Sequence, residues 1–202
     1  MPGSDHLGPC RPLPSGAMGL VRLGDLDWQR ALDHPELLAQ PTHAALLAWA
    51  RLIPEVAEQV QVAASDPGLA DTAAYVAAYH VPIDASVNCV VVLGSRAGEE
   101  RVAAAAIRAD TRADVNHVVK RLLDVRKLSF MTMDEAVVGS SMEYGGITPV
   151  GLPPEWRVLV DEAATGIDVA VIGSGVRHSK ILLPGTLLAE LPGAEVVPGL
   201  AR

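Results

Sequence analysis

The stretch V-N-C-V-V-V-L at residues 87–93 is followed, after the turn S-R-A-G at residues 95–98, by V-A-A-A-A-I at residues 102–107. Both runs are apolar and lack the alternation of a half-exposed strand, which indicates strands buried on both faces. Because only a short turn containing glycine separates them, we expect an antiparallel hairpin.

Strands and helices alternate around the hairpin. The clearest helix spans residues 114–123, where Asp114 can cap the first turn and apolar residues recur at helical spacing. Further strands are expected at 59–65, 127–130, 158–161, 169–173, 180–183 and 196–197, and further helices at 70–79, 133–138 and 185–191. Several connections between strands are too short for crossovers. The pattern therefore predicts an α/β (α+β) fold with a mixed sheet flanked by helices.

The N-terminal part of the chain has a different pattern. Residues 1–22 are rich in Gly and Pro and predict a loose arm. From Asp25 onward the apolar spacing predicts a helix, and a second helix is expected to begin at Thr42, a good N-cap residue. We therefore expect an N-terminal helical extension over residues 1–55 and one domain over residues 56–202.

Composition excludes several classes of protein. The 202 residues are 50% hydrophobic and 20% charged, which is globular and not disordered. Aromatic residues make up 3% and the net charge is −8, so a base-stacking platform or a broad nucleic-acid or membrane surface is not expected. Without an apolar signal segment, and with only Cys10 and Cys89 as cysteines, the expected location is the cytoplasm.

One segment carries the opposite charge to the chain as a whole. Between residues 108 and 127, six basic side chains face only three carboxylates. The basic residues are Arg108, Arg112, Lys120, Arg121, Arg126 and Lys127. They are either a solvated helix face or a local contact for nucleic-acid phosphates.

Two glycine-rich segments are candidates for ligand contact. The loop G-G-I-T-P-V-G at residues 145–151 allows a ligand to approach the backbone closely, although a tight connector has the same composition. The segment Gly173-Ser174-Gly175 ends a predicted strand and is either a small anion nest or a plain turn.

Other catalytic patterns have little support in the sequence. Ser174, His178 and Asp161 are the residue types of a hydrolase triad, but there is no G-x-S-x-G elbow and their spacing is not specific. The six histidines are scattered without the spacing of metal ligands. We therefore predict neither a triad nor a metal site.

Four segments together resemble one known family. They are S-V-N-C-V-V-V at 86–92, D-V-N-H-V-V-K-R-L-L-D-V-R-K-L-S-F at 114–130, G-G-I-T-P-V-G at 145–151 and V-I-G-S-G-V-R-H-S-K-I at 171–181. In their order and spacing they resemble the YbaK/ProX family, the aminoacyl-tRNA-editing domain that also occurs inserted in some prolyl-tRNA synthetases. The resemblance covers residues 85–197, with a weaker match at residues 60–72.

The resemblance implies a mixed, partly barrel-like sheet and a deacylase that hydrolyses the ester between a wrong amino acid and the tRNA 3′ end. It assigns catalysis to the backbone of Gly145 and to position 88, here Asn88. The expected pocket residues are Gly146, Ile147, Thr148 and Pro149 in the loop, with Gly173 and Ser179 on the opposite wall. No metal or cofactor is implied, and the partner is the acceptor end of a mischarged tRNA.

The sequence departs from the family pattern at two places. Asn88 stands where the family has a lysine, and Ser140-Ser141-Met142 stands where it has T-G-Y. Two functions therefore remain open from the sequence. One is a deacylase acting in trans, and the other is a non-catalytic protein that uses the same pocket to hold an aminoacyl or nucleotide ligand, or binds a protein partner. A synthetase or a second copy of the chain is a further possible partner.

Overall fold

The computed structural model describes residues 22–202, and the expected arm at residues 1–22 lies almost entirely outside them. The predicted hairpin is confirmed as β3 (Val87–Arg96) and β4 (Glu99–Arg108), which pair antiparallel along their whole length. Ala97 and Gly98 form the turn, with φ values of 54° and 90°. Two consecutive residues in the left-handed region are typical of the turn that matches the twist of a hairpin.

The hairpin lies within a five-stranded mixed sheet of order β5-β3-β4-β6-β9. The other strands are β5 (Lys127–Phe130), β6 (Arg157–Asp161) and β9 (Ala194–Val197). β5 pairs antiparallel with β3, whereas β4, β6 and β9 run parallel to one another. The mixed sheet predicted from the short connections is therefore confirmed.

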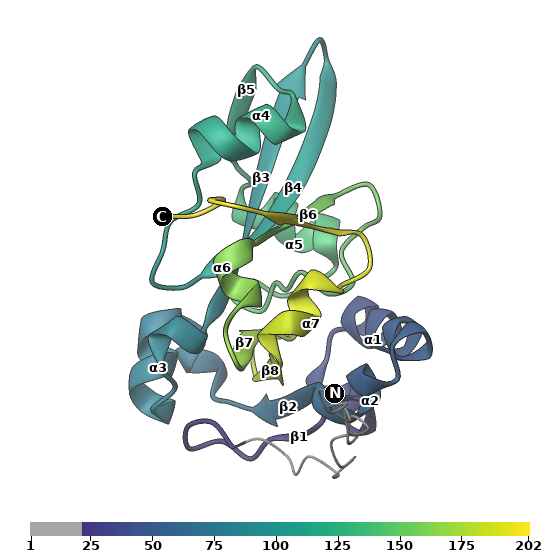
Figure 1. The fold of residues 1–202 in the computed structure, drawn as a ribbon, viewed down its shortest axis with the longest axis vertical. Coiled ribbons are helices and arrows are strands. Elements are labelled where there is room, and N and C mark those ends of the chain that lie inside the picture. The colour runs from purple at the N-terminus through teal and green to yellow at the C-terminus, as the bar shows by residue number, and fades with distance from the viewer. Residues whose placement is uncertain (1–21) are drawn as a thin grey trace, which may run out of the picture.

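A second sheet, of four antiparallel strands, has the order β1-β2-β8-β7. Its strands are β1 (Gln29–Arg30), β2 (Gln61–Ala64), β7 (Ala170–Gly173) and β8 (Ser179–Leu183). A single bridge between Ser86 and Val171 connects it to the larger sheet, just before β3 begins. The two sheets do not close into a barrel, and helices flank them (Figure 1).

The helices fall mainly at the expected places. They are α1 (Gln40–Leu52), α2 (Glu55–Gln59), α3 (Thr72–Tyr79), α4 (Lys120–Leu123), α5 (Met133–Ser140), α6 (Glu162–Thr165) and α7 (Gly185–Ala189). The predicted helix at residues 114–123 begins with a π-helical turn, and the Asp114 carboxylate accepts a hydrogen bond from the His117 N–H. Within residues 22–202 no helix has the length and apolar character needed to cross a bilayer.

The N-terminal segment differs from the expectation. Where a helix was expected from Asp25, the chain forms β1 and the 3₁₀ turns Ala31–Asp33 and Pro35–Leu37. The edge pairing of β1 with β2 and the proline at position 35 compete with a continuous helix. The second helix is present, but Ala39 occupies its N-cap position, and Thr42 is buried inside it.

Helix α1 contributes to the core of the four-stranded sheet. Leu46 and Trp49 are buried in the same apolar cluster as Ile172, Ile181 and Leu183. A second cluster lies between the five-stranded sheet and the helical segment that ends in α4. The division at residue 55 stays a prediction, and the packing of α1 shows that the described part of the N-terminal segment is joined closely to the rest.

Candidate functional site

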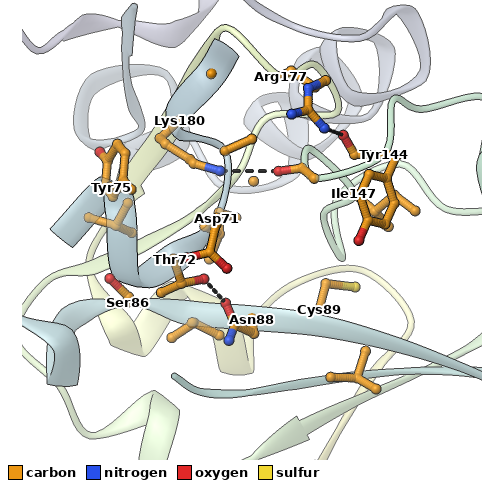
Figure 2. A pocket seen from close by; sticks show the side chains of 18 residues that line it. Asp71, Thr72, Tyr75, Ser86, Asn88, Cys89, Tyr144, Ile147, Arg177 and Lys180 are labelled. Carbon is orange, nitrogen blue, oxygen red and sulfur yellow. Dashed lines mark hydrogen bonds between the residues drawn. The ribbon is translucent and has the colours of Figure 1, made fainter. Parts of the chain in front are cut away.

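A pocket of about 480 Å³ opens where the two sheets meet. It lies between the start of β3, the N-terminus of α3, the loop after α5 and the strands β7 and β8 (Figure 2). The polar side chains that line it are Asp71, Thr72, Tyr75, Ser86, Asn88, Cys89, Tyr144, Arg177 and Lys180. The backbones of Gly145 and Gly173 complete the wall.

The two glycine-rich segments of the sequence pack against each other in one wall of this pocket. The Gly175 N–H donates a hydrogen bond of 2.7 Å to the Gly146 carbonyl oxygen. A Cβ atom on Gly146 would overlap the backbone of Val176, and one on Gly173 would overlap the backbone of Gly146. Glycine is therefore required at both positions for this backbone-to-backbone contact.

The start of α1 supports the same glycine segments from behind. The Ala39 N–H donates to the Ser174 carbonyl oxygen at 3.0 Å, and the Thr42 hydroxyl donates to the Val150 carbonyl oxygen at 3.2 Å. A Cβ atom on Gly175 would overlap Ala39, so these segments are in direct contact. The N-terminal segment thus helps to fix the loop that lines the pocket.

Asn88 lies in the pocket wall at the beginning of β3 and is half-buried. Its side-chain oxygen accepts a hydrogen bond of 2.9 Å from the Thr72 hydroxyl of α3 (Figure 2). With Oδ1 engaged in this way, the amide NH₂ remains as a donor. The structure therefore places Asn88 in the pocket wall beside other polar side chains, while its catalytic role stays a prediction.

Lys180 is a pocket residue that sequence analysis did not identify. It is only 9% exposed, and its Nζ donates a hydrogen bond of 3.2 Å to the carbonyl oxygen of Gly145 (Figure 2). The ammonium group lies 5.5 Å from the centre of the Tyr75 ring, a cation–π distance. Burial, and to a lesser extent the charge of Arg177, lower the pKa of Lys180 below its ordinary value.

With this geometry established, comparison with known proteins identifies the family. The family model described as "Aminoacyl-tRNA editing domain" matches residues 66–191, which is more than half of the chain. The chain belongs to the aminoacyl-tRNA editing domain family. The YbaK-type resemblance seen in the sequence is thereby confirmed.

Solved structures share the fold of this editing domain. Hypothetical protein APE2540 superimposes with a TM-score of 0.66 at 22% identity, over 78% of this chain and 99% of its own. A structure described as "a putative trans-editing enzyme for prolyl tRNA synthetase" superimposes with a TM-score of 0.64 at 19% identity, over 79% of this chain and 94% of its own. At such identities the likeness establishes the fold alone. No curated protein shows significant sequence similarity to the chain.

The remaining expected pocket residues of the editing domain divide into two groups. Ile147 and Gly173 line the pocket, whereas Gly146, Thr148 and Pro149 are buried and do not line it. Ser179 lies on the opposite face of β8, and its hydroxyl donates to the carbonyl oxygen of Leu37 at 2.5 Å. Because successive side chains of a strand point to opposite faces, the pocket residue of β8 is Lys180 and not Ser179.

The rim of the pocket is shaped by Arg177, another residue that the sequence left without a role in the pocket. Its guanidinium donates to the carbonyl oxygens of Tyr144 at 2.8 Å and Pro67 at 3.1 Å, and so links the loops before α3 and after α5. Its backbone N–H donates to the Glu143 carboxylate at 2.7 Å. These contacts hold the rim together around a positive charge.

The residue types of a hydrolase triad do not form one here. The Ser174 hydroxyl is hydrogen-bonded with Ser179, and the His178 ring contacts the carbonyl oxygen of Glu36. Asp161 lies in β6, on the other sheet, where burial raises its pKa. Among residues 22–202 no group of three His, Cys, Asp or Glu side chains is placed to hold a metal ion.

The basic residues of the sequence lie at two places. Arg108 stands opposite Val87 in the strand register and therefore lies at the pocket end of the hairpin. Its guanidinium forms an ion pair with Asp110. Arg126 and Lys127 are exposed at the other end, where Lys127 pairs with Ser95. Ser95 is seven residue steps along the extended strand from Asn88, which corresponds to about 23 Å. We call residues 120–127 the distal basic patch.

Proposed function

We propose that this editing domain is a deacylase that acts in trans on mischarged aminoacyl-tRNA, in the cytoplasm. The observation that carries the proposal is the pocket in which the glycine-rich loop, Asn88 and Lys180 converge. Its volume of about 480 Å³ lies within the range of small-ligand sites, about 300–1,000 Å³. Membership of the editing family gives the substrate class, an aminoacyl ester at the tRNA 3′ end.

The chemistry of such a pocket needs an oriented water molecule and hydrogen-bond donors. The water oxygen bonds to the ester carbonyl carbon, the bond from that carbon to the ribose oxygen breaks, and a proton passes to the ribose oxygen. The products are the free amino acid and a tRNA with its 3′-terminal hydroxyls restored. We assign stabilisation of the oxyanion that develops on the carbonyl to the amide N–H donors of Asn88, which lines the pocket. Gly145 allows the substrate to approach the loop backbone.

The distal basic patch extends the proposed tRNA contact beyond the pocket. Phosphates attract exposed Lys and Arg side chains whatever the base sequence. A patch about 23 Å from Asn88 suits the acceptor stem of a tRNA whose 3′ end lies in the pocket. We therefore assign phosphate contacts to Lys120, Arg121, Arg126 and Lys127 of the patch, and further contacts to Arg112 and to Arg108 at the pocket end of the hairpin.

The test is to incubate the protein with one tRNA charged with each of a panel of amino acids and to follow the loss of the ester. Catalysis requires release of at least one amino acid well above the spontaneous rate. Tight binding of charged tRNA without any release supports the alternative, a non-catalytic binding protein. The observation that favours this alternative is the neutral Asn88, which stands where the family has a charged lysine. Absence of both binding and release contradicts either function.

A further inference from the structure

One cation in the pocket lacks the anionic partner that buried charges usually have. Among the described residues, the hydrogen-bond acceptor of Lys180 Nζ is the Gly145 carbonyl oxygen, and no carboxylate lies within 4.0 Å of it. An ammonium group has three N–H donors. Because Lys180 lines the pocket, its remaining donors are available to a ligand.

The charged groups around Lys180 do not balance its charge. Arg177, at the rim, has the same sign, and the Tyr75 ring offers only a cation–π contact. Asp71 is the one carboxylate among the described residues that line this pocket. Its Oδ1 accepts the N–H groups of Ala73 and Ala74 as the N-cap of α3. The pocket therefore has an excess of positive charge in a chain whose net charge is −8.

We propose that Lys180 forms a subsite for an anionic oxygen of the substrate. This inference rests on the proposed function, since it takes the ligand to be an aminoacyl ester on a nucleotide end. The anion has two sources with the same chemistry, a carboxylate in the side chain of the amino acid or a phosphate of the terminal nucleotide. Either forms a charge-assisted hydrogen bond with the ammonium. A ligand with neither leaves a desolvated cation unpaired, which is unfavourable.

The test is a binding measurement that does not depend on hydrolysis. The probes are adenosine analogues with an amide in place of the ester, carrying Asp or Asn, each with and without a 5′-phosphate. Isothermal titration compares the wild type with Lys180→Met and with Arg51→Met. The last variant removes one positive charge from an exposed position of α1. We expect the wild type and Arg51→Met to prefer one anionic analogue over its neutral counterpart by about tenfold or more, and Lys180→Met to lose that preference.

The probes separate the two sources of the anion. A lost preference for Asp over Asn assigns Lys180 to the side-chain carboxylate, and a lost preference for the phosphorylated analogues assigns it to the phosphate. Lys180→Gln, checked by thermal melting, repeats the test if the Met variant does not fold. The proposal is overturned if the wild type binds none of the analogues, if it binds them without an anionic preference, or if the Lys180 variants keep that preference. A Lys180-dependent preference without ester hydrolysis retains the subsite and rejects only the deacylase.

Discussion

Gly145 and Gly98 both have a left-handed backbone, with φ values of 80° and 90°, but their surroundings differ. A Cβ atom on Gly145 would lie 3.1 Å from both the Ala70 Cβ and the Arg177 Nη1, whereas nothing lies within 4 Å of one on Gly98. We expect Gly145→Val to lower ester hydrolysis by about tenfold or more, because it displaces the loop from the pocket. Gly98→Val is the control for backbone strain and should keep its activity. Unchanged turnover in a folded Gly145→Val protein rejects the pocket assignment.

The Asn88 amide can be tested separately from the hydrogen bond that orients it. Asn88→Ala removes the donor from the pocket, and Thr72→Val removes only the bond of 2.9 Å to its oxygen. We expect Asn88→Ala to reduce turnover or ligand affinity more than Thr72→Val does, with small changes in melting temperature for both. Asn88→Lys should raise hydrolysis, because it restores a cation to the strand. If neither variant at position 88 alters binding or turnover, Asn88 has no role in the site.

Lys180 should make the folded protein less stable than it would be with a neutral side chain. The pKa of Lys180 is lowered on folding because burial disfavours its charged form. The resulting loss of stability is fully present at every pH below the lowered pKa. This unfavourable contribution disappears as the pH rises toward the ordinary value of 10.5. We expect Lys180→Met to raise the free energy of unfolding at pH 7 by about 0.5–2 kcal/mol, as measured by denaturant titration. A gain that does not shrink at higher pH contradicts this explanation.

The segment around α4 is the part of the molecule that we expect to contact tRNA phosphates. Arg121 and Arg126 are exposed, and neither forms an ion pair with a described residue. We expect Arg121→Glu with Arg126→Glu to weaken tRNA binding about tenfold or more, and added salt to weaken binding by the wild type. Filter binding at several salt concentrations measures both effects. If neither the double substitution nor added salt changes the affinity for tRNA, the patch is only a solvated helix face.

Elements with a strong local pattern could be predicted from the sequence. Unbroken apolar runs predict the strands of the hairpin, and apolar residues at helical spacing predict the helix at residues 114–123. The segment from Asp25 could not be predicted in this way, because its course depends on the pairing of Gln29 with Val62 and of Arg30 with Gln61, residues far apart along the chain. Lys180 was missed for a related reason. All five residues of β8 are buried, so no alternation in the sequence shows which of them faces the pocket.

Helix α1 connects the N-terminal segment to the core of the second sheet. Trp49 is 1% exposed within that core, whereas Leu52, on the same helix, is 74% exposed. We expect Trp49→Ala to lower the free energy of unfolding by about 3–5 kcal/mol and Leu52→Ala to change it by less than about 0.5 kcal/mol. Chemical denaturation of the two variants provides the comparison. Equal stabilities show that α1 is an appendage and not part of the core.

Residues 39–42 contact both glycine segments, so a comparison of the pocket among members of this family has to include these residues. The family match begins at residue 66, yet the backbone that braces the pocket loop begins at Ala39. A relative that conserves the loop but has another segment in place of α1 will hold the same glycines against a different support. Differences in substrate choice among such relatives can therefore originate outside the residues by which they are aligned.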